Sequence, residues 1–133
     1  MKTNNFIFWK LPALLWSLTI LALTSYPKLE IPDIGFSAMD KLAHMSVYYV
    51  FGFLLIRAFM ENRQDLPFYD YCRIGLYGIA FAVFDELHQK VIPGRFCEFW
   101  DGMADIIGIV LGIITFYIIK DRAIKKIADE VGE

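Results

Sequence analysis

Four stretches of the chain carry no charged side chain, and each is bounded by Lys, Arg, Asp or Glu. They are residues 11–26, 42–56, 74–84 and 106–119. Apolar blocks separated by charges are typical of membrane spans, whereas helices of a soluble bundle carry polar residues along their whole length. Hydrophobic residues make up 57% of the sequence, above the usual share in soluble domains. We therefore expect an all-α membrane protein with four transmembrane helices in a compact bundle.

The expected spans are residues 7–26, 41–60, 69–89 and 102–119, followed by a tail at 120–133, in one domain over residues 1–133. Of the 13 Lys and Arg residues, nine lie at the termini or around the connection between the second and third spans. Positive residues accumulate on the cytoplasmic side of membrane proteins. Both termini are therefore expected in the cytoplasm, in a multi-pass protein of a bacterial inner (plasma) membrane.

The uncharged stretches are too short to span a bilayer alone, so polar residues must enter three of the spans. At about 1.5 Å per residue, residues 74–84 cover only about half of a ~30 Å hydrocarbon core. The third span must therefore continue through the polar residues that follow. By the same reasoning, the second and fourth spans begin with polar residues and the third span ends with them. All of these residues then lie on the outer (periplasmic or extracellular) side: Asp40, Lys41, His44, Asp85, Glu86, His88, Gln89, Asp101 and Asp105.

Helical spacing gathers these residues onto narrow faces. At 100° per residue, one face carries Asp40, Lys41, His44 and Tyr48, one arc carries Asp85, Glu86 and Gln89, and one stripe carries Asp101, Asp105, Gly108 and Gly112. Small residues four apart let a neighbouring helix approach closely. The stripe of Gly108 and Gly112 could therefore pack within one chain or between two chains of a homo-oligomer.

Three motifs resemble the VanZ-like membrane proteins, the family that contains the teicoplanin-resistance protein VanZ. They are Asp40-Lys41-x-x-His44, then Glu86-x-His88-Gln89 followed by Pro93-Gly94-Arg95-x-x-Glu98, and finally Asp101-x-x-x-Asp105-x-x-Gly108-x-x-x-Gly112. The resemblance implies a role in cell-envelope antibiotic resistance, and it implies site residues among those of the motifs. One position departs from the family pattern, because Asn is more usual where this chain has Asp105.

Two functional hypotheses assign roles to these residues. In the first, an outward-facing pocket binds an outer-leaflet lipid or a lipid-linked cell-wall component, with Arg95 and Lys41 holding a phosphate or carboxylate. Further ligand-binding residues would be Asp40, Tyr48, Gln89, Glu98 and Asp105. In the second, the protein is an enzyme with His44 as general acid or base and Glu86 or Asp101 as its partner. Ser46 and Cys97 are then nucleophile candidates by position only.

Two alternatives remain. A metal-dependent hydrolase would draw its ligands from His44, Glu86, His88, Asp101 and Asp105, whose types suit Zn²⁺ or Mn²⁺. A structural protein would use the same polar residues only to hold its helices together, as satisfied networks do. The chain has no basic patch with interleaved aromatic residues, so we expect no nucleic-acid partner. We expect no cofactor either.

Overall fold

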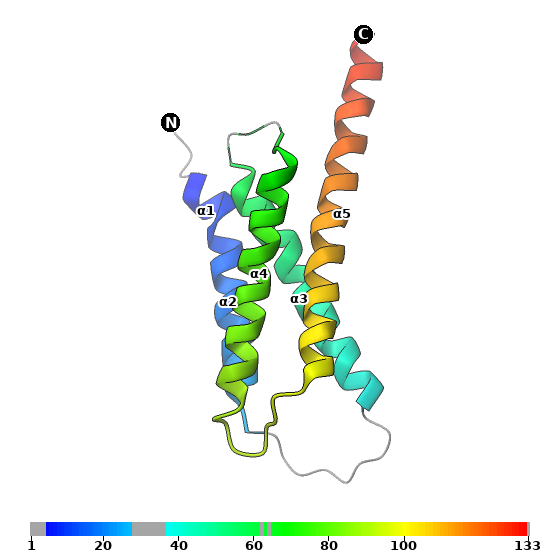
Figure 1. Cartoon of the computed structure of the whole chain (residues 1–133). Coiled ribbons are helices and arrows are strands. Elements are labelled where there is room, and N and C mark those ends of the chain that lie inside the picture. The colour runs from blue at the N-terminus through cyan, green and yellow to red at the C-terminus, as the bar shows by residue number, and fades with distance from the viewer. Residues whose placement is uncertain (1–4, 28–36, 62, 64, 133) are drawn as a thin grey trace.

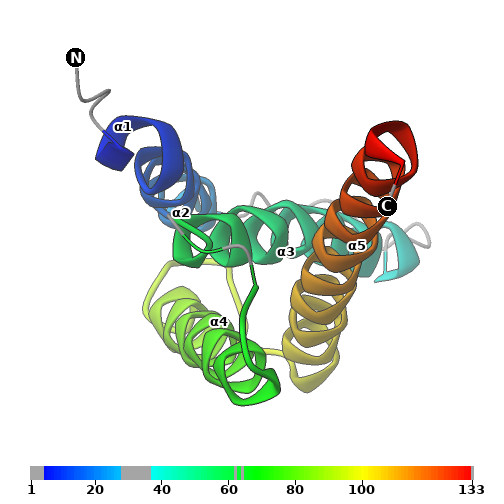
Figure 2. The ribbon, with the colours of Figure 1, turned by 90° about the horizontal axis from the view of Figure 1, so that it is seen from above.

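The computed structural model describes residues 5–27, 37–61, 63 and 65–132, and within these ranges the only regular elements are five α-helices. They are α1 (Asn5–Trp9), α2 (Leu11–Thr24), α3 (Ser37–Phe59), α4 (Phe68–Gln89) and α5 (Phe99–Val131). Helices α2 to α5 lie side by side, with α3 between α2 and α5, and α4 beside α3 and α5 (Figures 1 and 2). The chain is therefore all-α over its described residues, as predicted.

The first expected span, residues 7–26, is two helices rather than one. Helix α1 ends at Trp9, and α2 begins at Leu11 with Pro12 in its first turn. Proline has no backbone N–H and its ring clashes with the carbonyl four residues earlier, so a helix cannot run through Pro12 without a break. The break is stabilised by Lys10, whose Nζ lies 2.8 Å from Glu61 Oε2.

The other expected spans all begin slightly earlier than predicted. Helix α3 begins at Ser37, so that Asp40 lies in its first turn. Helix α5 begins at Phe99 and runs without interruption to Val131. The expected tail at 120–133 is therefore largely a continuation of the last helix, and Figure 1 shows it projecting beyond the ends of the other helices.

Helices α3 and α5 make the most extensive contact in the molecule, and glycines make it possible. A Cβ atom on Gly108 would lie 2.3 Å from the carbonyl oxygen of Met45, and one on Gly112 would lie 2.2 Å from that of Tyr49. The contact is reciprocal, because a Cβ on Gly52 would lie 2.4 Å from the carbonyl oxygen of Ile109. The glycine stripe thus packs within one chain. A homo-oligomer stays a prediction, but Gly108 and Gly112 are buried against α3 and are not available to form it.

Apolar side chains cover the outside of the molecule, whereas its interior is polar at one end. Leu15, Leu76 and Leu87 are each more than half exposed, whereas Asp85 and Asp105 are completely buried. An exposed apolar surface around buried acids is the reverse of a soluble protein and suits a lipid environment. Among the described residues, α3 (over Ala38–Phe59) and α5 are long and apolar enough to cross a membrane by length and composition, and α2 is a shorter apolar helix.

Candidate functional site

The predicted site residues all lie at one end of the helices. There α2 and α4 end while α3 and α5 begin, as the lower part of Figure 1 shows. This polar end holds Asp40, Lys41, His44 and Tyr48 of α3, Glu86 and Gln89 of α4, Arg95 and Glu98 of the α4–α5 connection, and Asp101 and Asp105 of α5. The alternating direction of successive helices therefore brings together motifs that are far apart in the sequence.

Asp85 is the most connected acid of the polar end, and it was missing from the predicted site. Its Oδ1 accepts a hydrogen bond from Thr24 Oγ1 at 2.7 Å, and its Oδ2 accepts bonds from Tyr48 Oη at 2.9 Å and Gln89 Nε2 at 3.2 Å. One carboxylate thus joins α2, α3 and α4. The helical arc shared by Asp85, Glu86 and Gln89 was a usable signal, but the motif resemblance drew attention to Glu86 instead. Nothing in the sequence singled out Thr24.

Tyr48 lies in the interior, where it lines a cavity between α2 and α3, and its predicted contact with a ligand stays a prediction. Its side chain is 1% exposed, and its ring lies edge-on to Phe51 with the centroids 6.1 Å apart. Together with its hydrogen bond to Asp85, this position makes Tyr48 part of the packing between α3 and α4.

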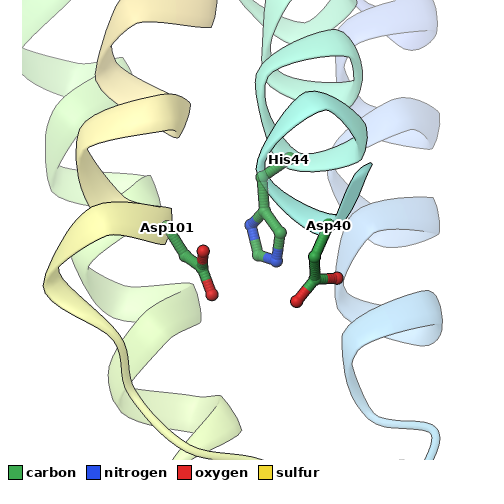
Figure 3. A group of neighbouring side chains, drawn as sticks. All are labelled: Asp40, His44 and Asp101. Carbon is green, nitrogen blue, oxygen red and sulfur yellow. The ribbon is translucent and has the colours of Figure 1, made fainter. Parts of the chain in front are cut away.

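His44 lies at the centre of the remaining acids. Its Nδ1 is 3.0 Å from Asp105 Oδ1, a pairing across α3 and α5. Figure 3 shows its ring between the carboxylates of Asp40, on its own helix, and Asp101, at the start of α5. The enzyme hypothesis named Glu86 or Asp101 as the hydrogen-bonding partner of His44, and in the structure that partner is Asp105. The nucleophile candidate Ser46 donates its hydroxyl hydrogen to the carbonyl oxygen of Leu42 at 2.7 Å.

The two cations expected to hold an anion are engaged with protein groups. Lys41 Nζ lies 3.3 Å from Asp101 Oδ1 and 3.6 Å from Glu98 Oε2, which joins α3 to the beginning of α5.

Arg95 holds the end of α2 against the end of α4. Its guanidinium donates to the carbonyl oxygens of Tyr26 (2.9 Å) and Leu23 (3.1 Å) and to Gln89 Oε1 (3.2 Å). A turn at Pro93 and Gly94 directs it there, because Gly94 has φ 75° and the Arg95 N–H donates to the Ile92 carbonyl at 3.1 Å. A cation at the last carbonyls of a helix is favourable because those groups lack intrahelical partners. Binding of an anion by Arg95 stays a prediction.

Two cavities flank the polar end. One, of about 230 Å³, lies between α4 and α5. Apolar side chains line most of it, and Glu86, Cys97 and Glu98 lie at its polar end. The other, of about 190 Å³, lies between α2 and α3 and reaches Asp40, His44 and Arg95 past Ile20 and Leu23. Each cavity joins an apolar surface to a polar group, which is the form an amphiphile requires.

Cys97 lies beside Glu86 in the connection between α4 and α5. Nearby protein atoms partly shield the Cys97 sulfur from water, which raises the pKa of the thiol, and the negative charge of Glu86 raises that pKa further. Since the thiolate is the nucleophilic form, this environment does not activate Cys97 at neutral pH. Cys72, at the other end of α4, is exposed, as is Cys97, and the two thiols are not joined.

Comparison with known protein families identifies a match over most of the chain. The model of the family described as VanZ/LLP1 matches residues 3–120, which is nearly the whole chain. No curated protein and no solved structure matches the chain.

Proposed function

The chain belongs to the VanZ/LLP1 family, and we propose that it binds a polar lipid or lipid-linked cell-envelope component from the outer leaflet of a bacterial inner membrane. In this proposal α2, α3, α4 and α5 all cross the membrane, and both termini are cytoplasmic. The beginning of α1 and the end of α5 lie at the same end of the molecule (Figure 1), as an even number of crossings requires. The polar end then faces the periplasm or the exterior.

The cavity between α4 and α5 carries this proposal. Ala82, Val83, Met103 and Ile106 line its apolar part, and Glu86 ends it. Glu86 is 6% exposed and its Oε2 has no hydrogen-bond partner among the described residues. A buried polar atom without a partner is costly. A lipid chain between α4 and α5 would place its headgroup at this atom, and capture of such a component would support resistance to glycopeptides of the teicoplanin type.

We expect Gly102→Leu to block this cavity without disturbing the helices. A Cβ on Gly102 would meet only Glu86 Cγ, at 3.9 Å, so the larger side chain enters the cavity rather than the backbone of a neighbour. If the new side chain displaces two CH₂ groups of the lipid chain from the cavity, binding loses about 1.6 kcal/mol. The amount of lipid retained on the purified protein should therefore fall at least about tenfold. Native mass spectrometry measures the retained lipid, and teicoplanin susceptibility of cells that carry each variant measures the phenotype.

Gly75→Leu is the matched control. Gly75 is also a helical glycine with room for a side chain, since a Cβ there would meet only Ile113 Cδ1 at 4.0 Å. It does not line the cavity between α4 and α5. It should keep both the lipid and the phenotype. Equal lipid retention by the two variants would contradict the proposal.

The two cysteines provide a test of orientation. In spheroplasts, a membrane-impermeant maleimide should label Cys97 in a Cys72→Ser variant, but label Cys72 in a Cys97→Ser variant only after permeabilisation. Because the pKa of the Cys97 thiol is raised, its labelling should be slow at pH 7. Below that pKa, each increase of one pH unit should make the labelling about tenfold faster, because the thiolate is the reactive form. Labelling of Cys72 rather than Cys97 in intact spheroplasts would reverse the orientation.

A second candidate function is purely structural. It is favoured by Asp85 and Arg95, whose hydrogen bonds join α2, α3 and α4 at the polar end. The Gly102→Leu experiment separates the two candidates, because a purely structural polar end has no retained lipid to lose.

A further inference from the structure

Four buried carboxylates lie at the polar end, and their surroundings differ. Asp85, Glu86, Asp101 and Asp105 are each at most 6% exposed. Asp85 is satisfied by three protein donors, as described above. Among the described residues, no Lys or Arg side chain is buried to this degree at the polar end, and Lys41, the cation paired with Asp101, has a side chain that is 30% exposed. Glu86, Asp101 and Asp105 therefore form a cluster of buried carboxyl groups around His44.

Among the described residues, two of these carboxylate oxygens have neither a hydrogen bond nor a cation beside them, whereas Asp101 Oδ1 has Lys41 Nζ 3.3 Å away. They are Glu86 Oε2 and Asp105 Oδ2, and neither has a partner among the described residues although both side chains are more than nine-tenths buried. Buried polar atoms in native proteins are nearly always paired, and a bound ion is one explanation for an exception. Carboxylate oxygens attract cations, so a cation is the partner that these two atoms call for.

The geometry around His44 is that of a ligand set. His44 of α3, Glu86 of α4 and Asp105 of α5 each offer one ligand atom, and these three atoms lie within 4.8 Å of one another. Two ligands of Zn²⁺, each about 2.0–2.2 Å from the ion, are at most about 4.4 Å apart, so only a small closing movement is required. A second trio shares His44 and meets the same limit with Asp40 and Asp101 (Figure 3).

We propose that His44, Glu86 and Asp105 bind a divalent transition-metal ion, Zn²⁺ or Mn²⁺. One imidazole with two carboxylates suits these ions better than Ca²⁺ or Mg²⁺, which prefer oxygen ligands alone. Glu86 and His88 are two residues apart on one helix and their side chains diverge, which is an objection to a metal site built on that pair. The structure removes that objection, since His44 rather than His88 accompanies Glu86 and each ligand comes from a different helix.

Two consequences follow from an ion at this position. It joins α3, α4 and α5 where they meet, so its binding should stabilise the fold. It also offsets the negative charge at the end of the cavity between α4 and α5, which an anionic headgroup would otherwise meet. The proposal does not rest on lipid binding, because the purified protein can be tested with the metal alone.

The test uses the full-length protein in detergent after removal of metals with a chelator. Zn²⁺ or Mn²⁺ is added back, unbound metal is removed by gel filtration, and elemental analysis and thermal unfolding follow. We expect about one ion per chain and a rise in Tm. Glu86→Gln keeps the shape of the side chain but removes a ligand, and should weaken binding at least about tenfold, since even partners of the ligands contribute 10–100-fold.

Glu130→Gln is the matched control, because Glu130 is an exposed acid near the other end of α5 and lies outside the trio. It should bind the metal like the wild type. Where Glu86→Gln fails to fold, Asp105→Asn replaces it with the same expectation. A wild type without stoichiometric metal, or equal binding by wild type and the Glu86→Gln or Asp105→Asn variant, overturns the proposal. Either result leaves the Gly102→Leu test of lipid binding unaffected.

Discussion

Replacing Gly112 or Gly108 with alanine should prevent α3 and α5 from packing, and of all single methyl additions to this chain it should have the largest effect. The new Cβ would lie 2.2 Å from the Tyr49 carbonyl oxygen at position 112 and 2.3 Å from that of Met45 at position 108. These neighbours are backbone atoms, so no side-chain rotation relieves the clash and the helices must separate. Overpacking costs about 1–3 kcal/mol, and occasionally more, where side chains can adjust.

The cost should be at the upper end of that range or beyond it, because packing is the main force between helices in lipid. Thermal unfolding in detergent and accumulation in the membrane measure it. Gly75→Ala is the control, since its Cβ would meet only Ile113 Cδ1 at 4.0 Å, and it should leave the Tm nearly unchanged. Wild-type stability of both Gly108→Ala and Gly112→Ala would mean that α3 and α5 do not cross as described.

Replacing Asp85 with leucine should be the most damaging change at the polar end. Tyr48 and Gln89 would lose their acceptor while 1% and 3% exposed. A buried donor without a partner costs about 1–3 kcal/mol, so these two groups together should cost about 2–6 kcal/mol. Thr24 contributes less to this loss, because its hydroxyl can donate instead to the Ile20 carbonyl oxygen 3.0 Å away.

Asp85→Asn is the informative companion variant. Its amide oxygen can accept from Tyr48 and Gln89, while its NH₂ group donates to Thr24 Oγ1 and the Thr24 hydroxyl turns to Ile20. We therefore expect a loss below about 1 kcal/mol, comparable with a single net hydrogen bond. Chemical unfolding in detergent compares the two variants. An Asp85→Asn variant as unstable as Asp85→Leu would show that the charge, not the hydrogen bonds, holds the three helices.

Much of the fold could be predicted from the sequence because helical spans obey local rules. Run length alone required the third span to continue through Glu86 and Gln89, and α4 does end at Gln89. The break at Pro12 was equally local and could have been predicted from proline chemistry, but the apolar residues on both sides of Lys10 and Pro12 suggested one continuous span. The unbroken course of α5 to Val131 was less accessible, since residues beyond Ile119 are charged and their helix needs no membrane.

The candidate site was likewise predictable from the sequence in one part and not in another. Helical spacing placed Asp101, Asp105, Gly108 and Gly112 on one stripe, and that stripe does face α3. Spacing could not say that Asp105 rather than Asp101 contacts His44, or that Arg95 donates to carbonyls at the end of α2. Those choices depend on how far each helix is rotated and shifted against its neighbour.

The sequence by itself determined that this protein is helical and apolar outside, with acids, histidine and glycine on defined faces at one end. These properties follow from residue spacing and from the cost of charge in lipid, which act within each helix. Only the tertiary structure decided the partners: Asp85 joins three helices, the glycines admit α3, and His44 lies among Glu86, Asp101 and Asp105. Which side chains contact one another depends on residues far apart in the sequence. These contacts are set by the close crossing of α3 and α5 and by the connections that bring distant motifs to the same level along the helices.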